Sequence, residues 1–448
     1  MALPFGNRDK PFTQKVLTAE LRNTFESLPD ARSGTNKKYL MSDAALSAFS
    51  VFFMQSPSFL AHQKTMQRSK GNNNAKSLLG IHQIPSENQI RNLMDTVPPE
   101  TLSPLFHSIF QGLVQTGKLD TYKVLDEQLL VALDGTEYYS STRIHCPCCS
   151  VKTQKNKEIR YYHTALTPVV LSPAQSDVIP LAPEFITPQD GQKKQDCELT
   201  AAKRWLLRER HRLPEKITIL GDDLYCHQPW CETLIAQEVN FILVCKPTSH
   251  QTLYEWVDDF ERTDCVQHSQ TRRWTGKQYI TTHYRFMNEL PLRNSDDAVQ
   301  VNWCEIKETD EQGRTLYLNA FATNFELTSE NVADIVAAGR SRWKIENENN
   351  NTLKTKGYRF DHNFGHGKQH LSSVLATLII LAYLFHTMLN WFDECYSLLR
   401  EALPSRQTFF DDIRALTRYM YFDNWDSMLE FMLEGLEIPT PKRVKQTE

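Results

Sequence analysis

The sequence predicts an α/β protein, in which helices flank a mixed β-sheet core that is interrupted by an all-β insertion and preceded by a helical N-terminal domain. Three observations support this fold class. Residues 1–120 contain helical patterns, whereas residues 121–246 alternate short apolar runs with amphipathic stretches. Residues 247–333 then carry β-rich segments separated by turn sequences, and helical patterns return from residue 334.

The composition is that of a globular protein with a basic N-terminal end. The 448 residues exceed one ordinary domain, and the hydrophobic content of 40% and charged content of 23% argue against a disordered chain. A net charge of −4 excludes a uniformly basic protein. Residues 1–76, however, hold 11 lysines and arginines against 5 aspartates and glutamates, a local charge of +6. This end is therefore the first candidate for phosphate contacts.

The sequence favours a cytoplasmic protein. Residues 1–10 are polar and no apolar stretch follows them, so no signal peptide is expected. In such a chain the ten cysteines are expected to be reduced thiols or metal ligands. Residues 371–391 are apolar over a length that can cross a bilayer, but interspersed polar side chains favour a buried core helix. We therefore expect no membrane partner.

The N-terminal domain is expected to be helical. Residues 44–54 are apolar with small side chains, and residues 86–94 open with a helix-start pattern. Pro98 and Pro99 then end the helical pattern. Residues 69–74 combine a glycine with three asparagines and are expected to form a flexible polar loop. No short turn between two periodic helices is recognisable, so a helix-turn-helix is not predicted.

The core segment predicts five strands and two helices in the order β, β, β, α, β, α, β. The continuous apolar run at residues 129–133 is typical of a strand buried on both faces. The other elements follow in chain order: strands at 161–171 and 177–181, a helix at 194–210, a strand at 217–220, a helix at 229–237 and a strand at 241–244.

The insertion is expected to consist of strands. Residues 279–286, 299–303 and 316–321 alternate or are rich in β-forming residues, and polar turns separate them. Helical patterns resume through residues 342–354 and in the aromatic-rich segment 407–436. The chain therefore divides into an N-terminal helical domain, a first core part, the insertion, the last core helices and a C-terminal helical tail (1–120, 121–246, 247–333, 334–400 and 401–448).

Three acidic residues are candidates for a metal site. Asp134 and Asp222 follow two of the core strands, and the carboxyl ends of central strands form the edge where open α/β sheets bind ligands. Glu346 on a late helix completes a set of hard oxygen ligands, which select Mg²⁺ or Mn²⁺. Two such ions about 3.5–4 Å apart can assist an in-line phosphoryl displacement. The simpler interpretation is that a strand-end aspartate caps a turn.

Two cations accompany the glutamate on the late helix. Arg342 and Glu346 lie four residues apart and share a face. Lys354 lies eight residues beyond Glu346, about 80° round an ideal helix, so Arg342 and Lys354 are candidates for phosphate contact. A solvated helix with an i,i+4 ion pair is the structural alternative.

These residues resemble the motifs of the DDE transposases of bacterial insertion sequences, in the branch with a ribonuclease H-like core and a β insertion before the last acidic residue. The order of core elements matches that family, and Arg342 and Glu346 fit its late-helix signature. Gly339 replaces the aromatic residue of that signature, and Leu353 occupies the lysine position, one residue before Lys354. The segment that follows at 363–368 is similar to one unclassified group of insertion sequences.

The resemblance implies a DNA transposase that performs metal-dependent strand cleavage and strand transfer of an insertion sequence. Asp134, Asp222 and Glu346 would be the catalytic residues and hold two Mg²⁺ or Mn²⁺ ions, with Asp223 and Glu348 as neighbouring rivals for the last two. The partners would be DNA at the element ends, bound by the N-terminal domain, and target DNA, with a homodimer in the synaptic complex. The alternatives are a nuclease or resolvase on the same core, or a non-catalytic zinc-stapled DNA-binding protein derived from a transposase.

A second metal site is expected at a cysteine cluster. Cys146 and Cys149 form a C-x₂-C pair on a predicted loop between the first two strands, which is half of a tetrahedral zinc site. A closed site of four ligands would be structural, whereas buried free thiols are the alternative. The candidates for the remaining ligands are Cys197 and His163, with His145 and Cys148 as alternates.

Three histidines recur at four-residue intervals near the end of the predicted core. On a helix, the spacing of His362, His366 and His370 would suggest a metal site. Gly365 and Gly367 instead favour a loop, which we expect near the catalytic face.

Overall fold

The structure is a computed structural model that describes residues 12–33, 37–188 and 197–441. Parts of three predicted features lie outside these residues: the polar start of the chain at 1–10, the beginning of the helix expected at 194–210, and the tail at 442–448.

The central strand of the core is β1 (Leu129–Ala132), whose residues are all buried. It pairs in parallel with β8 (Ile217–Gly221) on one side and antiparallel with β5 (Val169–Leu171) on the other. Beyond β8 lies the parallel strand β9 (Asn240–Val244), and beyond β5 lies β6 (Ile179–Pro180). These short apolar strands confirm the predicted mixed sheet, because each apolar run is buried within it.

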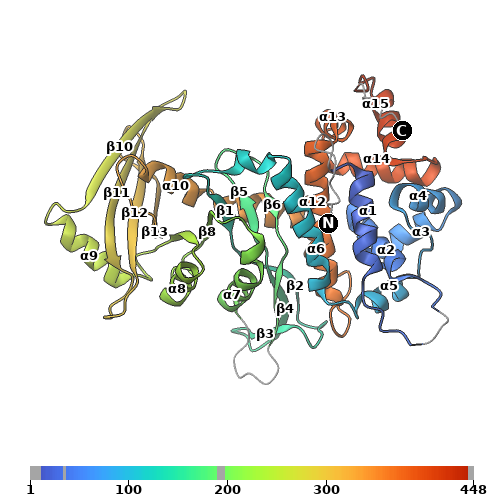
Figure 1. Ribbon diagram of the computed structural model, residues 1–448, viewed down its shortest axis with the longest axis horizontal. Helices are drawn as coiled ribbons and strands as arrows, with labels where there is room; N and C mark the ends of the chain where they lie inside the picture. Colours follow the sequence, from blue (N-terminus) through green and yellow to red (C-terminus); the bar gives the residue numbers. More distant parts are fainter. Residues whose placement is uncertain (1–11, 34–36, 189–196, 442–448) are drawn as a thin grey trace.

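Two helices connect the strands on the β8 side. Helix α7 (Glu198–Glu209) precedes β8, and α8 (Gln228–Ala236) links β8 to β9. Both lie in front of the strands in Figure 1. The buried Trp205 indole of α7 donates a hydrogen bond of 3.0 Å to the carbonyl oxygen of Ala182, which fixes this helix to the chain before it.

The strand expected at residues 161–171 is two strands in different sheets. Strand β4 (Ile159–Leu166) ends before β5 begins, and it belongs to a second, smaller sheet. Pro168 has no N–H to donate to a ladder, and the Thr167 N–H instead donates to the Asp134 carbonyl oxygen at 3.0 Å. The other strands of the smaller sheet are β2 (Gly135–Ser141), β3 (Ser150–Thr153) and β7 (Glu184–Ile186).

The insertion continues the core sheet. Its last strand pairs antiparallel with β9, with Phe321 opposite Val244, so the main sheet has nine strands. The expectation of an all-β insertion is wrong, because it also contains helix α9 (Gln251–Glu261). Leu253 and Val257, four residues apart, are fully buried on one face of that helix. The four strands are β10 (Gln267–Trp274), β11 (Tyr279–Pro291), β12 (Gln300–Thr309) and β13 (Thr315–Thr323).

Helices make up the N-terminal part of the described chain. The loop expected at residues 69–74 is the start of a helix, because Asn74 is buried and its side-chain amide donates to the Thr417 and Met420 carbonyl oxygens at 2.9 and 2.7 Å. The helices are α1 (Gln14–Glu26), α2 (Met41–Phe53), α3 (Phe59–Met66), α4 (Ser69–Leu79), α5 (Glu87–Met94), the 3₁₀ turn η1 (Pro99–Leu102), α6 (Ser103–Gln115) and η2 (Lys118–Tyr122).

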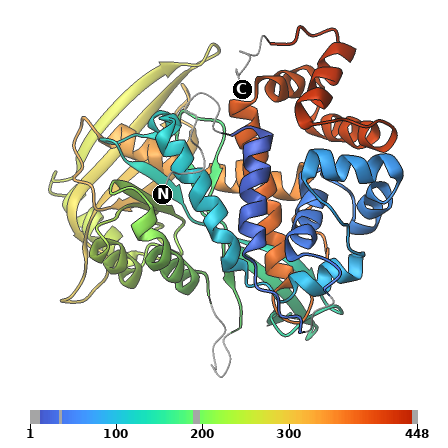
Figure 2. The same ribbon diagram turned by 45° about the vertical axis from the view of Figure 1, so that its right-hand side comes forward.

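Helix α12 (Leu371–Phe392) runs through the middle of the helical half of the molecule, beside α1 and α2 (Figure 2). By length and composition it is apolar enough to cross a membrane, but most of it is buried inside the protein. The rings of Phe49 on α2 and Phe385 on α12 lie 5.2 Å apart at 63°, an edge-to-face contact of that core. This packing accounts for its apolar sequence.

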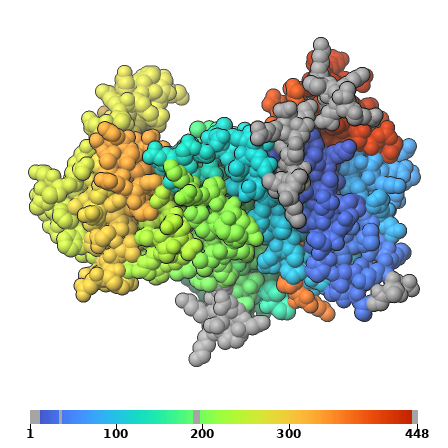
Figure 3. All heavy atoms as spheres, viewed as in Figure 1, coloured from blue at the N-terminus to red at the C-terminus, as the bar shows by residue number. Residues whose placement is uncertain are grey.

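Of the remaining C-terminal elements, α13, α14 and α15 lie on the same side as the N-terminal helices, whereas α10 packs against the strands of the insertion at the opposite end of the molecule (Figure 1 and Figure 3). One apolar core runs through all of these parts. The elements are α10 (Val332–Arg340), the π-helix η4 (Ile345–Asn350), α11 (Asn351–Thr355), α13 (Glu394–Ala402), α14 (Arg406–Tyr419) and α15 (Trp425–Gly435).

A buried carboxylate, Glu209 at the end of α7, links the core to α6. It accepts a hydrogen bond from His107 Nε2 at 2.5 Å and another from Arg208 Nε at 2.7 Å. Burial alone would raise the pKa of Glu209, but these two partners outweigh it and lower the pKa to about 2.

The lowered pKa makes this contact sensitive to acid. Its contribution to the free energy of unfolding, up to about 3 kcal/mol, is present above pH 4.5 and is lost as the pH falls towards 2. We expect Glu209→Gln to destabilise the protein at neutral pH, and the difference from the native chain to shrink over this window in urea unfolding. The exposed Glu215→Gln is the matched control, and an equal loss at all pH values would contradict the assignment.

Candidate active site

Asp134 and Asp222 occupy equivalent positions on neighbouring strands. Ala132 of β1 pairs with Leu220 of β8 in a parallel register, so each aspartate lies two residues beyond a paired position. Both therefore emerge at the same edge of the sheet, as the sequence predicts. Gly221 is required before Asp222, because a Cβ there would lie 2.7 Å from the Tyr225 Cβ.

Asp222 lies near enough to Asp134 to raise its pKa, whereas Asp223 is held by a different loop. The Asp222 carboxylate accepts a hydrogen bond from the Leu224 N–H at 2.9 Å and acts electrostatically on Asp134. The Asp223 carboxylate accepts hydrogen bonds from the Lys246 N–H at 2.8 Å and the Ser249 hydroxyl at 2.5 Å. This geometry favours Asp222 over its rival.

Glu346 belongs to a π-helix rather than to the continuous α-helix expected at 342–354. Its Oε1 lies 2.9 Å from Arg342 Nη2, and its charge acts on Asp134. Asn350, four residues further along, donates a hydrogen bond of 2.8 Å to Asp134 Oδ2. The wide turn therefore directs the polar side of η4 at the strand edge, and π-bulges are frequent at functional sites.

Glu348 has different neighbours from those of Glu346. Its carbonyl oxygen accepts a hydrogen bond from the Tyr383 hydroxyl of α12 at 2.9 Å. Its charge acts on the buried Lys344, which opposes the lowering of the Lys344 pKa by burial. The structure thus favours Glu346 as the third carboxylate.

Arg342 and Lys354 are placed differently by the π-helix. Arg342 is partly buried, pairs with Glu346 and lowers the pKa of Asp134 by its charge. The angle of about 80° expected between Glu346 and Lys354 assumed an α-helix with 3.6 residues per turn. It does not apply here, because residues 345–350 form a π-helix. Leu353, at the lysine position of the family signature, is fully buried, and Lys354 is partly exposed beside it.

Gly339, the other departure from the signature, is explained by packing. A Cβ on this residue would lie 2.8 Å from Phe321 Cε1 of β13 and 2.9 Å from Ile242 Cγ2 of β9. An aromatic ring from the insertion thus fills the space beside α10 that a side chain on residue 339 would need.

A fourth carboxylate, Glu198, lies in the site and was missed by the sequence analysis. It is the first residue of α7, and its Oε1 accepts hydrogen bonds from the Gly135 N–H at 2.9 Å and the Tyr225 hydroxyl at 2.7 Å. A Cβ on residue 135 would lie 2.2 Å from Glu198 Oε2. The glycine after Asp134, which looked like a turn residue, therefore makes room for this carboxylate.

The carboxylates repel one another strongly. Burial and the Glu198 carboxylate raise the pKa of Asp134 to about 7. The Glu346 and Asp222 carboxylates add to this rise, and the Arg342 guanidinium opposes it. Such a set of hard oxygen ligands is costly without a counter-charge and fits Mg²⁺ or Mn²⁺.

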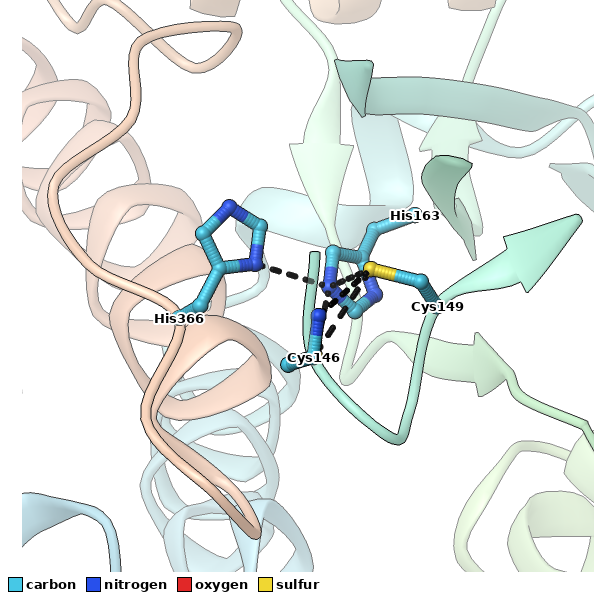
Figure 4. Close-up of side chains that lie close together, drawn as sticks. All are labelled: Cys146, Cys149, His163 and His366. Carbon is cyan, nitrogen blue, oxygen red and sulfur yellow. Dashed lines mark hydrogen bonds between the residues drawn. The ribbon is translucent and has the colours of Figure 1, made fainter. Parts of the chain in front are cut away.

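The cysteine cluster is also assembled, with one change of ligand. Cys146 and Cys149 lie beside His163 of β4, and the fourth member is His366 (Figure 4). Cys197 is not brought to the cluster, because it stands at the start of α7, where its Sγ lies 3.2 Å from Thr200 Oγ1.

The two alternates for this cluster have other partners. The Cys148 thiol donates to the Gln369 carbonyl oxygen at 3.1 Å, and the His145 ring stacks on Tyr161 at 4.2 Å between centroids. His366 lies on a loop, as expected for the three spaced histidines. Nothing in the sequence indicates that this loop reaches the C-x₂-C pair, because about two hundred residues separate them.

Measurements of metal binding can distinguish the proposed carboxylate ligands from their neighbouring rivals. We expect Asp134→Asn, Asp222→Asn and Glu346→Gln each to weaken Mn²⁺ binding by more than the roughly 10–100-fold typical of outer-shell changes, measured by titration calorimetry. Asp223→Asn and Glu348→Gln are the matched controls and should bind Mn²⁺ as the native chain does. Weaker binding in the controls, with normal binding in the first set, would contradict the assignment.

The comparisons with known proteins concern the region that contains this site. Residues 188–385 match a family described as "Transposase DDE domain", a span that includes Asp222 and Glu346. No curated protein matches the chain significantly. A cryo-EM structure of a piggyBac transposase synaptic complex with hairpin DNA aligns at 9% identity and a TM-score of 0.37, covering 97% of this chain and 89% of that one. The family match over residues 188–385 confirms the predicted resemblance to the DDE transposases.

Proposed function

We propose that the protein is a DDE transposase that cleaves DNA at the ends of an insertion sequence and joins the ends to target DNA in a metal-dependent reaction. The observation that carries this proposal is the placing of Asp134 and Asp222 at equivalent points beyond two paired strands, with Glu346 near enough to act on Asp134. Burial and the Glu198 carboxylate raise the pKa of Asp134 to about 7, and the Glu346 and Asp222 carboxylates add to this rise.

Two Mg²⁺ or Mn²⁺ ions would be held by these three carboxylates. When bound, the ions lower the pKa of the attacking hydroxyl and stabilise the leaving oxygen of an in-line displacement. The donor set fits such ions because it consists of carboxylate oxygens whose charges need compensation.

Neighbouring side chains position the proposed ligands. Asn350 donates to Asp134, and its own amide oxygen accepts hydrogen bonds from Thr167 Oγ1 at 2.8 Å and Asn349 Nδ2 at 3.0 Å. This buried chain of hydrogen bonds holds the Asp134 carboxylate in one orientation. Arg342 holds Glu346 in the same way and adds a positive charge for the DNA phosphate.

The reaction would proceed as two phosphoryl transfers. In the first, the oxygen of a water molecule attacks the phosphorus that joins the element end to the flanking DNA. The 3′-oxygen of the element's terminal nucleotide then leaves as a hydroxyl. In the second, this 3′-hydroxyl attacks a phosphorus in the target strand and displaces a 3′-oxygen there. Both transfers are in line and use the same edge of the sheet.

The proposed partners are the element ends, target DNA and a second copy of the chain in the synaptic complex. The basic N-terminal residues are the proposed contact to the element ends, and Lys354 is a further candidate for phosphate contact. The cytoplasm is the proposed compartment, in keeping with ten free cysteines.

A transposition assay tests the function. A donor plasmid carrying the gene with its flanking DNA should give Mg²⁺-dependent excision and integration, and Asp134→Asn should abolish both, a loss greater than the roughly 10–100-fold of an outer-shell change. Asp223→Asn is the control that keeps the fold and the activity. Cutting without integration would instead indicate a nuclease or resolvase, and binding without cutting would indicate a non-catalytic DNA-binding protein.

The supporting residues should matter less than the ligands. We expect Asn350→Ala and Glu198→Gln to slow strand cleavage by roughly 10–100-fold, because each removes a group next to Asp134 rather than a proposed ligand. Glu198→Gln should also stabilise the metal-free protein, since it removes one of the repelling charges. Cleavage rates and thermal unfolding without metal check the two effects, and a Glu198→Gln protein that is less stable without metal would contradict the electrostatic account.

A further inference from the structure

Four side chains from distant parts of the sequence meet with the spacing of a tetrahedral metal site. The two sulfur atoms of Cys146 and Cys149 are 3.7 Å apart, and each lies 3.3 Å from His163 Nε2. His163 Nε2 is in turn 3.2 Å from His366 Nδ1. All four ligand atoms lie within 4.8 Å of one another (Figure 4).

These distances match the edges of a zinc tetrahedron. With Zn–S bonds of about 2.3 Å and Zn–N bonds of about 2.0–2.1 Å, a regular tetrahedron has edges of about 3.8 Å between sulfurs, 3.6 Å from sulfur to nitrogen and 3.3 Å between nitrogens. Each measured distance falls within about 0.3 Å of the corresponding edge.

Hydrogen bonds or a disulfide cannot explain the arrangement. His163 Nε2 lies within hydrogen-bonding distance of three atoms, the two sulfurs and His366 Nδ1, but a ring nitrogen of neutral imidazole has one proton or one lone pair. The sulfur–sulfur separation of 3.7 Å is far beyond the 2.05 Å or so of a disulfide. A cation at the common centre satisfies all four atoms at once.

We propose that Cys146, Cys149, His163 and His366 bind one Zn²⁺ ion as a closed structural site. Two thiolates and two imidazoles are a common set for structural zinc. Cys146, Cys149 and His163 are buried. Aromatic rings enclose the site, since Tyr138 stacks on His163 at 5.5 Å and Tyr139 meets His366 edge-on at 4.0 Å.

The site joins the two segments that carry the proposed catalytic carboxylates. Cys146 and Cys149 lie between β2 and β3 and His163 lies on β4, in the small sheet whose first strand begins directly after Asp134. His366 lies in the loop at residues 357–370, which follows the helices that carry Glu346. We call this segment the histidine loop.

The histidine loop has little regular structure of its own, so its anchors decide its position. On one side, the Asp95 carboxylate at the end of α5 accepts hydrogen bonds from four successive backbone N–H groups, at residues 368–371, over 2.8–3.1 Å. The zinc site provides the second anchor, on the side of the small sheet. The ion is therefore a positioning element between the Asp134 and Glu346 segments.

Cobalt substitution tests the ligand set without any assay of activity. The full chain, purified and then stripped by a chelator, should bind one equivalent of Co²⁺ at this cluster and show the visible bands of tetrahedral cobalt with a thiolate charge-transfer band. Zn²⁺ should displace the cobalt and abolish both bands. A folded native chain that takes up Co²⁺ without these bands would overturn the proposal.

Matched variants assign the ligands. Cys149→Ser and His366→Ala should each lower Zn²⁺ affinity by more than about 100-fold, because they remove a ligand rather than an outer-shell group. Cys197→Ser and Cys148→Ser should retain the full zinc content by mass spectrometry of the metal. Retention of the cobalt bands in Cys149→Ser, or their loss in Cys197→Ser, would overturn this ligand set.

Hydrogen exchange of the native chain tests the positioning role even if a variant fails to fold. On removal of Zn²⁺, exchange should increase in the histidine loop and in residues 142–149, whereas the strands β8 and β9 should remain protected. Zinc binding does not require the carboxylates, so Asp134→Asn should keep its zinc, and failure of the catalytic proposal would leave this result unchanged. Unaltered exchange in the histidine loop after zinc removal would overturn the positioning role.

Discussion

The parallel pairing of β1 with β8 is the constraint on which the candidate site depends. Its register places Asp134 and Asp222 at equivalent points beyond two fully buried strands, so neither backbone can shift without unpairing the centre of the sheet. Other parts of the chain are arranged around this fixed edge. Helix α7 brings Glu198 to it from one side, and η4 brings Glu346 and Asn350 from the other.

The gathering of like charges at this edge is balanced by local contacts. Asn350 holds one oxygen of Asp134, the Gly135 N–H and the Tyr225 hydroxyl hold Glu198, and Arg342 holds Glu346. These contacts orient the carboxylates but do not remove their repulsion, which adds to the effect of burial in raising the pKa of Asp134. A site that is oriented yet short of positive charge is suited to cations that arrive from solution.

The sequence predicted the parts of this arrangement that depend on local pattern. Buried parallel strands are continuous apolar runs, and an aspartate at the end of each is visible without a structure, so the strands at 129–133 and 217–220 and their aspartates were found. The elements that were missed depend on distant contacts. Asn74 is helical because the C-terminal end of α14 accepts its hydrogen bonds. Residues 161–171 divide at a proline, and the residue before that proline donates a hydrogen bond to residue 134.

The same limit applied to the sites. Glu198 looks ordinary in the sequence and becomes a candidate only when the fold sets it beside Gly135. His366 stood out by its spacing from two other histidines, but only the fold shows that it lies beside the C-x₂-C pair. The π-helix could not be predicted from the sequence either, because residues 345–350 have a composition that is equally compatible with an α-helix. Local pattern thus predicts where strands end, but not which side chains from elsewhere meet there.

The contact between Gly339 and Phe321 shows that this part of the core is shared between the last catalytic helices and the insertion. The Phe321 ring of β13 occupies the space that the aromatic residue of the family signature would need at position 339 on α10. The volume at this contact is therefore shared by residues 339, 321 and 242, and a bulky side chain at 339 fits this backbone only if Phe321 and Ile242 both give way. Substitutions at these positions are coupled, and the insertion cannot be exchanged for another without compensating change in α10.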